Sequence, residues 1–205
     1  MITLYGWAGS PNVLKVRVML EEAEIPYEER RVKREEDENR TPEFLQISAT
    51  GLLPAITDSE TGASVFESSA ILLYLADRTG KFLPAEPALR ADVFKWHVFE
   101  AANISPAIAN IYKLYYLDDD WAGSAIEFHQ QKLIGAIELL NQQLEKSDYI
   151  AGDCSIADFA MFPLSNILED FLERPLADFP NLEQWCNRMR NRPGVKRAAN
   201  YVNAA

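Results

Sequence analysis

The stretch that decides the fold is residues 52–69, which read LLPAITDSETGASVFESS. Its two apolar runs, residues 52–57 and 63–66, have the length and composition of short strands, and the polar residues between them form a turn. Pro54 lies near the start of the first run. This position suits a proline, because a proline has no N–H to donate to the hydrogen-bond ladder of a central strand. Glu67 then begins a helical pattern that continues to about residue 78. The stretch therefore predicts two strands that are joined by a turn and followed by a helix.

Upstream of this stretch, strand and helix patterns alternate. Ser10 and Pro11 supply an N-cap and a first helical residue directly after a short β-rich run. The expected elements are a strand over 2–6, a helix over 11–23, a strand over 27–32, a charged and solvated loop over 33–40, and a short helix over 41–47. The first 80 residues thus give the order βαβ, a short helix, then ββα.

Downstream, strand patterns are absent from residue 89 onward. Apolar residues with helical spacing cover residues 94–116, 124–146, 156–172 and 182–190. The segment 83–87 contains two prolines and is the natural linker. These patterns predict an α/β domain over residues 1–82 and an all-helical domain over residues 88–205.

The composition limits the classes of function. The chain has 205 residues and a formal net charge of -11. The electrostatic field of this negative charge repels a phosphate backbone, so we expect no nucleic-acid partner. A local basic pocket that binds an anionic ligand is still compatible with this net charge. The N-terminus lacks the pattern of a signal peptide, and no apolar run approaches the roughly 20 residues of a membrane helix. We therefore expect a cytoplasmic protein that does not enter a membrane.

Cysteine and histidine are sparse. Cys154 and Cys186 form neither a CxxC pair nor a zinc spacing, and their surroundings favour packing. His97 and His129 are the only histidines in the sequence, and they suggest neither a metal cluster nor a Ser-His-Asp triad. We expect no metal.

Two features in residues 52–69 can carry chemistry, and each has a structural alternative. A cis peptide before Pro54 would leave the backbone N–H and C=O of Leu53 free to pair with an extended peptide. The alternative is an ordinary trans proline at a sheet edge. Glu67 and Ser68 begin a helix, where free N–H groups and the dipole favour a carboxylate. The alternative is that both residues only cap that helix.

A third feature is Ser10-Pro11-Asn12, directly after the first strand. A hydroxyl or an amide at a helix N-terminus can donate to a thiolate, and the helix dipole also favours that charge. Such contacts lower the pKa of a thiol and raise the fraction that is ready to attack. The alternative is that Ser10 is a plain N-cap.

Taken together, these residues resemble the cytosolic glutathione transferase superfamily. The resemblance covers nearly the whole chain and rests on residues 4–12, 52–55, 66–71 and 155–158. It implies a thioredoxin-like N-terminal domain that holds glutathione and an all-α C-terminal domain. Ser10-Pro11-Asn12 is most similar to the bacterial Nu-type pattern, in which threonine stands where this chain has serine. Ser155 and Asp158 resemble a capping-box variant that begins a buried helix, so we assign them to folding.

The resemblance also implies roles for the residues of the site. Ser10 and Asn12 are expected to contact the glutathione sulfur, and Leu53 is expected to pair with the cysteinyl unit beside a cis Pro54. Glu67 and Ser68 are expected to hold the γ-glutamyl group.

Two further parts of the site are expected. Leu52 stands where related proteins often have a basic residue, so Arg40, with Asn39 beside it, is the expected partner of the glycyl carboxylate. The expected electrophile pocket lies between the domains and comprises Trp7, Tyr112, Tyr115 and Tyr116. Core packing or a dimer contact is the alternative for these aromatic residues. A homodimer is expected from the resemblance.

The leading functional hypothesis is a glutathione transferase that stabilises the thiolate of its co-substrate glutathione. That thiolate would attack a small hydrophobic electrophile in detoxification, or reduce a disulfide or a peroxide, and neither route needs a protein cysteine. The alternative is a binding or regulatory module that has kept the fold without catalysis.

Overall fold

The structure is a computed structural model of the chain, and it describes residues 1–117, 121–172 and 174–200. The chain forms two compact units. The first comprises Met1–Ala85 and the chain from Arg190 on, and the second is Glu86–Met189. The first boundary lies in the expected linker. The C-terminal residues, however, group with the first unit and not with the helices that precede them, because the last helix packs against the first helix.

A four-stranded sheet forms the centre of the first unit. Its strands are β1 (Ile2–Gly6), β2 (Tyr27–Arg31), β3 (Ala55–Asp58) and β4 (Ser64–Phe66), in the order β2-β1-β3-β4. β1 and β2 are parallel, whereas β3 is antiparallel to both β1 and β4. All four expected strands are present, and the thioredoxin-like fold of this unit is confirmed.

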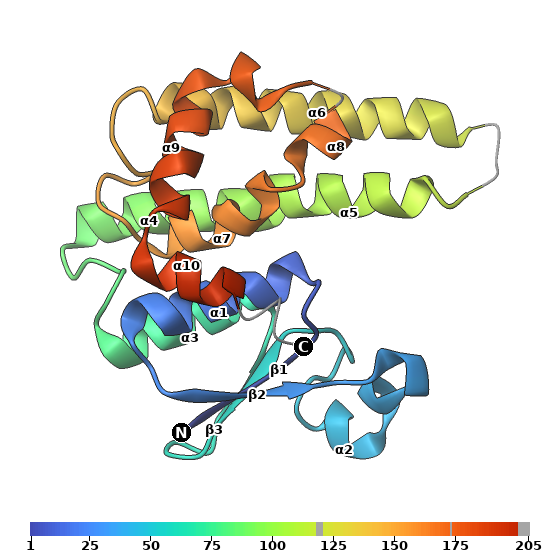
Figure 1. Cartoon of the computed structure of the whole chain (residues 1–205), viewed down its shortest axis with the longest axis vertical. Coiled ribbons are helices and arrows are strands. Elements are labelled where there is room, and N and C mark those ends of the chain that lie inside the picture. Colours follow the sequence, from blue (N-terminus) through green and yellow to red (C-terminus); the bar gives the residue numbers. More distant parts are fainter. Residues whose placement is uncertain (118–120, 173, 201–205) are drawn as a thin grey trace. The chain divides into compact units, whose positions relative to one another are not determined.

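The described residues of this unit also form the helices α1 (Pro11–Ala23), α2 (Pro42–Leu45), α3 (Ser68–Thr79) and α10 (Pro193–Asn200). α1 packs against α3 on one face of the sheet and against α10 (Figure 1). α1 approaches β1 closely, since a Cβ on Gly6 would lie 2.7 Å from Cγ1 of Val13. α2 adds Phe44, whose ring meets that of Tyr5 edge-on at 5.9 Å. Tyr5 is therefore part of a small apolar cluster.

The charged segment over residues 33–40 is more ordered than the expected loop. It forms two 3-10 turns, Arg34–Glu36 and Glu38–Arg40. The Glu38 carboxylate accepts hydrogen bonds from the backbone N–H of Lys33 at 2.8 Å and from Arg30 at 2.7 Å. The sequence pattern predicted a solvated segment correctly but missed these turns, because they depend on pairing between individual charges.

The sequence patterns did not predict α10, which Glu22 of α1 holds in place. One carboxylate oxygen of Glu22 accepts the N–H groups of Gly194 and Val195 at 3.0 and 3.2 Å. The other accepts a hydrogen bond from Nε of Arg192 at 3.1 Å. Glu22 thus caps the N-terminus of a helix that lies far away in the sequence.

Asp58, the last residue of β3, is a buried carboxylate with a full set of donors. It accepts hydrogen bonds from the Tyr74 hydroxyl at 2.7 Å and from the N–H of Glu60 at 3.0 Å, and Arg78 pairs with it at 2.8 Å. Burial acts to raise the pKa of Asp58, but these hydrogen bonds and the Arg78 charge outweigh burial. The pKa of Asp58 therefore lies below its ordinary value.

The second unit is helical. Its elements are α4 (Pro87–Phe99), a π-helical turn (Glu100–Ile104), α5 (Ser105–Leu114), α6 (Ala122–Gln143), α7 (Ile156–Ser165), α8 (Leu168–Leu172), a 3-10 turn (Leu176–Asp178) and α9 (Pro180–Arg190). α5 runs alongside α6, and α4 packs against α7 (Figure 1). The expected helix over 94–116 thus begins earlier and contains a π turn, and the expected helix over 156–172 is two helices. No helix in the described ranges has the length and apolarity to span a membrane.

The buried helix α7 begins with the predicted capping box. The Ser155 hydroxyl accepts a hydrogen bond from the N–H of Ala157, and Asp158 accepts the N–H of Ser155 at 3.0 Å. Asp158 also accepts the N–H of Ile150 at 3.0 Å and the indole N–H of Trp185 at 2.8 Å. Burial raises the pKa of Asp158, although these hydrogen bonds oppose that effect. Asp158 therefore connects three segments of the helical unit.

Candidate functional site

Three loops that carry predicted site residues meet at one end of the sheet. Tyr5 in β1 pairs with Ala55 in β3, and Ala55 pairs with Phe66 in β4. The end of β1, the start of β3 and the end of β4 are therefore neighbours. The chain continues from these points into Ser10–Asn12, Leu53–Pro54 and Glu67–Ser68. The structure thus brings the three sequence features to adjacent positions.

Ser10 is buried at the N-terminus of α1, and its hydroxyl oxygen accepts the N–H of Val13 at 3.3 Å. The N-cap alternative is therefore observed. It does not compete with a sulfur contact, because a hydroxyl that accepts through a lone pair can still donate its proton. Asn12 is half-buried in the first turn of the same helix. Both side chains lie where the helix dipole favours negative charge.

The peptide bond between Leu53 and Pro54 is cis. Of the two alternatives that the sequence left open, the structure has the one in which the Leu53 backbone can pair with an extended peptide. Leu53 itself is half-buried and Pro54 is buried.

Asn39 and Arg40 contact the loop that leads to this cis peptide. The Asn39 amide donates to the carbonyl oxygen of Gly51 at 2.8 Å, and Arg40 donates to that of Thr50 at 3.2 Å. Gly51 has φ +65°, and a Cβ there would lie 2.7 Å from the carbonyl oxygen of Asn39. The sequence did not reveal this supporting role. Arg40 is exposed and uses one of its five donors in this bond, so its other donors can still meet a carboxylate.

Glu67 does not cap α3 with its side chain, so that alternative is wrong for this residue. Its side chain is exposed, and its backbone has φ +68°, an uncommon conformation for a residue other than glycine. Such strained residues concentrate at binding sites. Ser68 is the first residue of α3 and is half-buried. The helix N-terminus and an exposed carboxylate thus lie side by side.

The four aromatic residues predicted for the electrophile pocket are exposed in this chain. Trp7 is 40% exposed, and Tyr112, Tyr115 and Tyr116 are 54%, 49% and 73% exposed. Core packing is therefore wrong for them. Trp7 belongs to the first unit, whereas the tyrosines lie at the end of α5 in the second. The rings of Tyr112 and Tyr116 meet edge-on at 5.1 Å, and the hydrogen bond that Tyr116 donates to Tyr112 raises the pKa of Tyr116.

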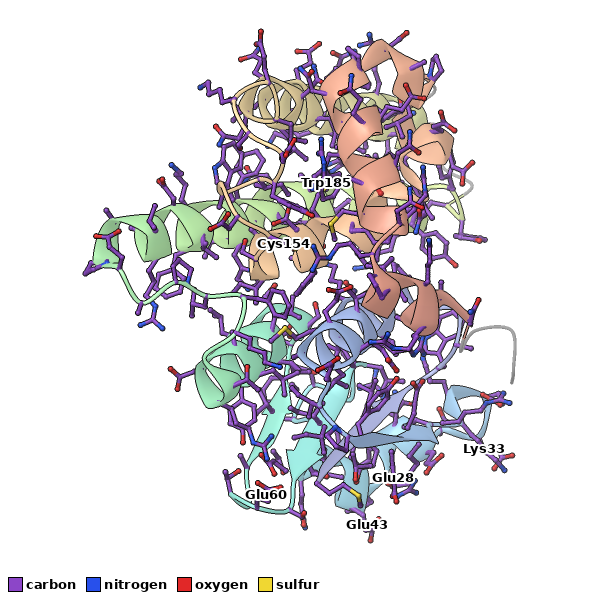
Figure 2. All side chains as sticks on the ribbon, turned by 60° about the vertical axis from the view of Figure 1, so that its left-hand side comes forward. Glu28, Lys33, Glu43, Glu60, Cys154 and Trp185 are labelled. Carbon is purple, nitrogen blue, oxygen red and sulfur yellow. The ribbon has the colours of Figure 1, made fainter. Side chains whose placement is uncertain are left out.

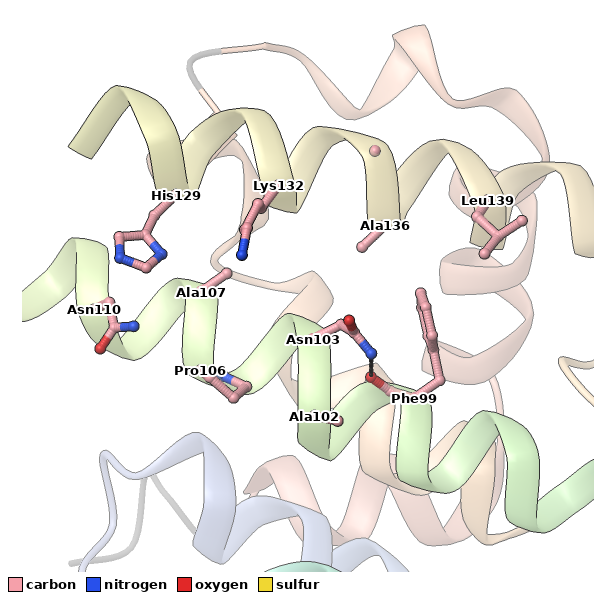
Figure 3. A pocket seen from close by; sticks show the side chains of 11 residues that line it. Phe99, Ala102, Asn103, Pro106, Ala107, Asn110, His129, Lys132, Ala136 and Leu139 are labelled. Atoms are coloured by element: carbon pink, nitrogen blue, oxygen red, sulfur yellow. Dashed lines mark hydrogen bonds between the residues drawn. The ribbon is translucent and has the colours of Figure 1, made fainter. Parts of the chain in front are cut away.

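The helical unit contains a pocket of its own, with a volume of about 420 Å³, between α6 and the helices α4 and α5 (Figure 3). His129 and Lys132 project into it from α6, opposite Asn103 and Asn110, and Phe99 and Leu139 lie towards one end. The sequence patterns did not predict this pocket. The sequence hints at the pocket only through small lining residues such as Ala107 in α5 and Ala136 in α6. Small residues of this kind also occur where helices simply pack together, so they do not distinguish a pocket.

Both cysteines belong to the helical unit, and neither forms a disulfide bond; Cys186 is buried and Cys154 is half-buried. Figure 2 shows Cys154 in the loop before α7. The same view shows Glu28, Glu43 and Glu60 on the surface of the first unit, in keeping with the acidic composition. Within residues 1–117, 121–172 and 174–200, no three His, Cys, Asp or Glu residues are placed to hold a metal ion.

Comparison with known proteins identifies the family. Residues 1–77 match the glutathione S-transferase N-terminal domain, and residues 107–193 match the C-terminal domain. A disulfide-bond oxidoreductase of Escherichia coli, YfcG, is 35% identical over 97% of this chain and 94% of its own length.

Two solved structures are similar over 97% of this chain, each with a TM-score of 0.87. A glutathione transferase from Pseudomonas putida, with one glutathione disulfide bound per subunit, is 28% identical, and 90% of its chain is covered. A glutathione transferase family member from Pseudomonas fluorescens, with two glutathione molecules bound, is 32% identical, and 92% of its chain is covered. The chain therefore belongs to the glutathione S-transferase superfamily.

Proposed function

We propose that the protein is an enzyme that binds glutathione along the end of β1, β3 and β4. The observation that carries this proposal is the convergence of Ser10, the cis Leu53–Pro54 peptide and Glu67 at adjacent strand ends. Neighbouring strands are about 4.8 Å apart, so three strands span about 10 Å. An extended tripeptide also spans about 10 Å. The size of the site therefore suits glutathione.

Each part of the tripeptide has a proposed partner. Glu67 accepts from the γ-glutamyl ammonium, and Ser68 with the N-terminus of α3 donates to the carboxylate. The Leu53 backbone pairs with the cysteinyl unit. Ser10 and Asn12 donate to the sulfur, in the manner of Nu-type enzymes. Arg40, placed by the Asn39 segment, is the proposed partner of the glycyl carboxylate.

We propose disulfide reduction as the favoured reaction. The glutathione thiolate attacks one sulfur of the substrate disulfide, forms a mixed disulfide and expels the other sulfur as a thiolate. A second glutathione thiolate then attacks the glutathione sulfur of the mixed disulfide, so that glutathione disulfide and the second substrate thiol are released. Two glutathione molecules are oxidised and one disulfide is reduced. The E. coli relative named as a disulfide-bond oxidoreductase supports this choice.

Conjugation uses the same activated sulfur. The thiolate forms a bond to an electrophilic carbon, and the leaving group departs with the electron pair of the broken bond. Trp7 is a proposed contact for a small hydrophobic electrophile, as are Tyr112, Tyr115 and Tyr116. Peroxide reduction would start from the same thiolate. We also propose a homodimer and a cytoplasmic location, where glutathione is kept reduced.

Calorimetric titration with reduced and with oxidised glutathione tests the proposal. Wild-type protein should bind at least one form. Glu67→Ala should weaken that binding, whereas Glu43→Ala, which changes an exposed carboxylate on α2, should not. A preference for the oxidised form would favour disulfide chemistry. If neither form binds at millimolar concentration, the enzyme hypothesis is refuted, and the alternative of a non-catalytic module with the same fold remains.

A further inference from the structure

The pocket of the helical unit has a polar end and an apolar end (Figure 3). His129 and Lys132 project into the polar end from α6 and face Asn110 of α5. Phe99 and Leu139 lie towards the other end. The volume of about 420 Å³ is in the range of small-molecule sites. The lining therefore suits a small ligand with one charged end and one apolar end.

The charge of the polar end is opposite in sign to the charge of the chain. The sequence contains 31 Asp and Glu residues, yet none of those that the structure describes lines the pocket. The Lys132 ammonium lies 4.7 Å from the centre of the Phe128 ring and forms no ion pair with a described carboxylate. A cation–π contact at the surface is weaker than a charged hydrogen bond. The pocket is thus a local basic site that an anion can occupy.

The donors at this end match a phosphate group. Lys132 and His129 are three residues apart on α6, so their side chains lie on the same side of the helix. Asn110 supplies an amide from the opposite wall, and that amide bonds to no other residue in the described part of the chain. Three residues therefore offer donors to one point. A phosphate monoester has three terminal acceptor oxygens, whereas a carboxylate has two.

The length of the pocket indicates what the phosphate is attached to. Seven residues of α6 separate Lys132 from Leu139, which places the two ends about 10 Å apart. At the far end, the Phe99 ring offers a stacking surface for a flat group. The Asn103 amide beside it donates to the carbonyl oxygen of Phe99 at 3.1 Å, so its own oxygen can still accept a hydrogen bond. A flat ring at this distance from a phosphate is the arrangement in a nucleoside monophosphate.

Both walls of the pocket depart from regular helix. Gly135 lies within the 22-residue helix α6, where glycine is less favourable than alanine. A Cβ at Gly135 would meet no atom within 4 Å, so neighbouring side chains do not require glycine there. The opposite wall contains the π-helical turn Glu100–Ile104, in which the N–H of Ser105 donates to the carbonyl oxygen of Glu100. Such turns are frequent at functional sites.

We propose that this pocket is a second binding site, for a phosphate monoester that carries a flat ring, the class to which nucleotides belong. Lys132, His129 and Asn110 bind the phosphate, and Phe99 stacks on the ring. None of the residues proposed to hold glutathione or the second substrate lines the pocket, so this inference goes beyond the proposed function.

Calorimetry with three probes tests both halves of the inference. Adenosine 5′-monophosphate (AMP) has the phosphate and the ring, ribose 5-phosphate lacks the ring, and adenosine lacks the phosphate. Wild-type protein should bind AMP about tenfold or more tightly than either of the other two probes.

A charge variant and its control test the polar end. Lys132→Gln should weaken AMP binding by about tenfold or more, because it removes a charged hydrogen bond. Lys146→Gln removes the same charge from an exposed lysine just beyond α6 and should change the affinity by less than about twofold.

A matched pair of glycine variants locates the binding. Gly135→Leu fills the pocket and also favours the helix, so it should abolish AMP binding without lowering the urea midpoint. Gly123→Leu makes the same change in the first turn of α6, outside the lining and again with no atom within 4 Å of the Cβ. It should bind AMP as wild-type protein does.

Several results would overturn the inference. Absence of AMP binding at millimolar concentration, or equal affinity for adenosine, would remove the phosphate site. Equal affinity for ribose 5-phosphate would remove the ring contact, and a flat carboxylate such as 2-naphthoate that binds more tightly than AMP would contradict the choice of a phosphate. AMP binding that persists in Gly135→Leu would exclude this pocket. Glutathione titrated into the same variants should bind as to wild-type protein, so the proposed function stands or fails separately.

Discussion

Ser10→Ala should produce two effects that can be measured independently. The first is on stability, because the Ser10 hydroxyl caps α1 through Val13. Loss of a serine N-cap costs about 1 kcal/mol. The Oγ–N distance of 3.3 Å is at the long end for a hydrogen bond, and Pro11 remains at the first helical position, so we expect no more than about 1 kcal/mol. Urea unfolding followed by circular dichroism measures this loss.

The second effect is on the thiol of bound glutathione. A hydrogen bond to a charged group contributes about 1.5–3 kcal/mol, and one pKa unit corresponds to about 1.4 kcal/mol. Losing the Ser10 donor should therefore raise the thiol pKa by about 1–2 units and lower turnover at pH 7 by about tenfold or more. Ultraviolet absorbance of the thiolate, titrated against pH, measures the pKa directly. The pH–rate profile should move to higher pH by the same amount.

Ser10→Thr keeps the hydroxyl and should restore both the stability and the thiol pKa. Asn12→Ala should raise the thiol pKa but leave the Ser10 cap in place. The reasoning is refuted if Ser10→Ala lowers stability while the thiol pKa stays at the wild-type value in both Ser10→Ala and Asn12→Ala. In that case, Ser10 would be an N-cap and nothing more.

Three further predictions concern buried carboxylates. Asp158→Ala leaves four donors without their acceptor, namely the N–H groups of Ile150 and Ser155, the Ser155 hydroxyl and the Trp185 indole, and should lower the free energy of unfolding by about 3–5 kcal/mol. Asp153→Ala, which changes an exposed carboxylate, should change it by less than about 0.5 kcal/mol, and equal urea midpoints for the two variants would contradict this prediction. The lowered pKa of Asp58 means that its contribution to stability is present above its unfolded pKa of about 3.9 and is lost as the pH falls through its native pKa. Asp58→Asn should therefore make the free energy of unfolding fall less steeply as the pH is lowered into the acid range. An unchanged slope would show that other groups determine the acid sensitivity. Glu22→Ala should accelerate hydrogen exchange in α10, and unchanged protection there would mean that Glu22 does not hold this helix.

Local signals predicted much of the fold. Ser10 and Pro11 mark the start of α1, and Ser155 with Asp158 marks the start of α7, because N-caps depend on residues within one turn. α10 escaped prediction for the opposite reason. Its N-terminus is capped by Glu22, which lies far away in the sequence, so the residues near Gly194 alone do not reveal the cap.

For the candidate site, the sequence predicted which residues take part but not how they are arranged in space. The order of Ser10, Pro54 and Glu67 in the chain could be read from the sequence, but only the strand register shows that they lie at neighbouring strand ends. The positive φ of Glu67 left no trace in the sequence, since glutamate is not a residue typical of that conformation. The close packing of the Trp7 ring against Gly9, where a Cβ would lie 2.5 Å from Cζ3 of the indole, was equally hidden, because glycine after a strand usually indicates backbone freedom.

The return of α10 to α1 has a consequence for synthesis on the ribosome. β1 to α3 leave the ribosome first, but α10 follows only after the entire second unit. At about 5–20 residues per second, the intervening hundred or so residues take roughly 5–20 s to translate. During that interval, Glu22 and the α1 surface that α10 later covers are open to solvent and to chaperones. A nascent chain that is arrested after residue 189 would present this surface permanently, and should be a better chaperone substrate than the finished protein.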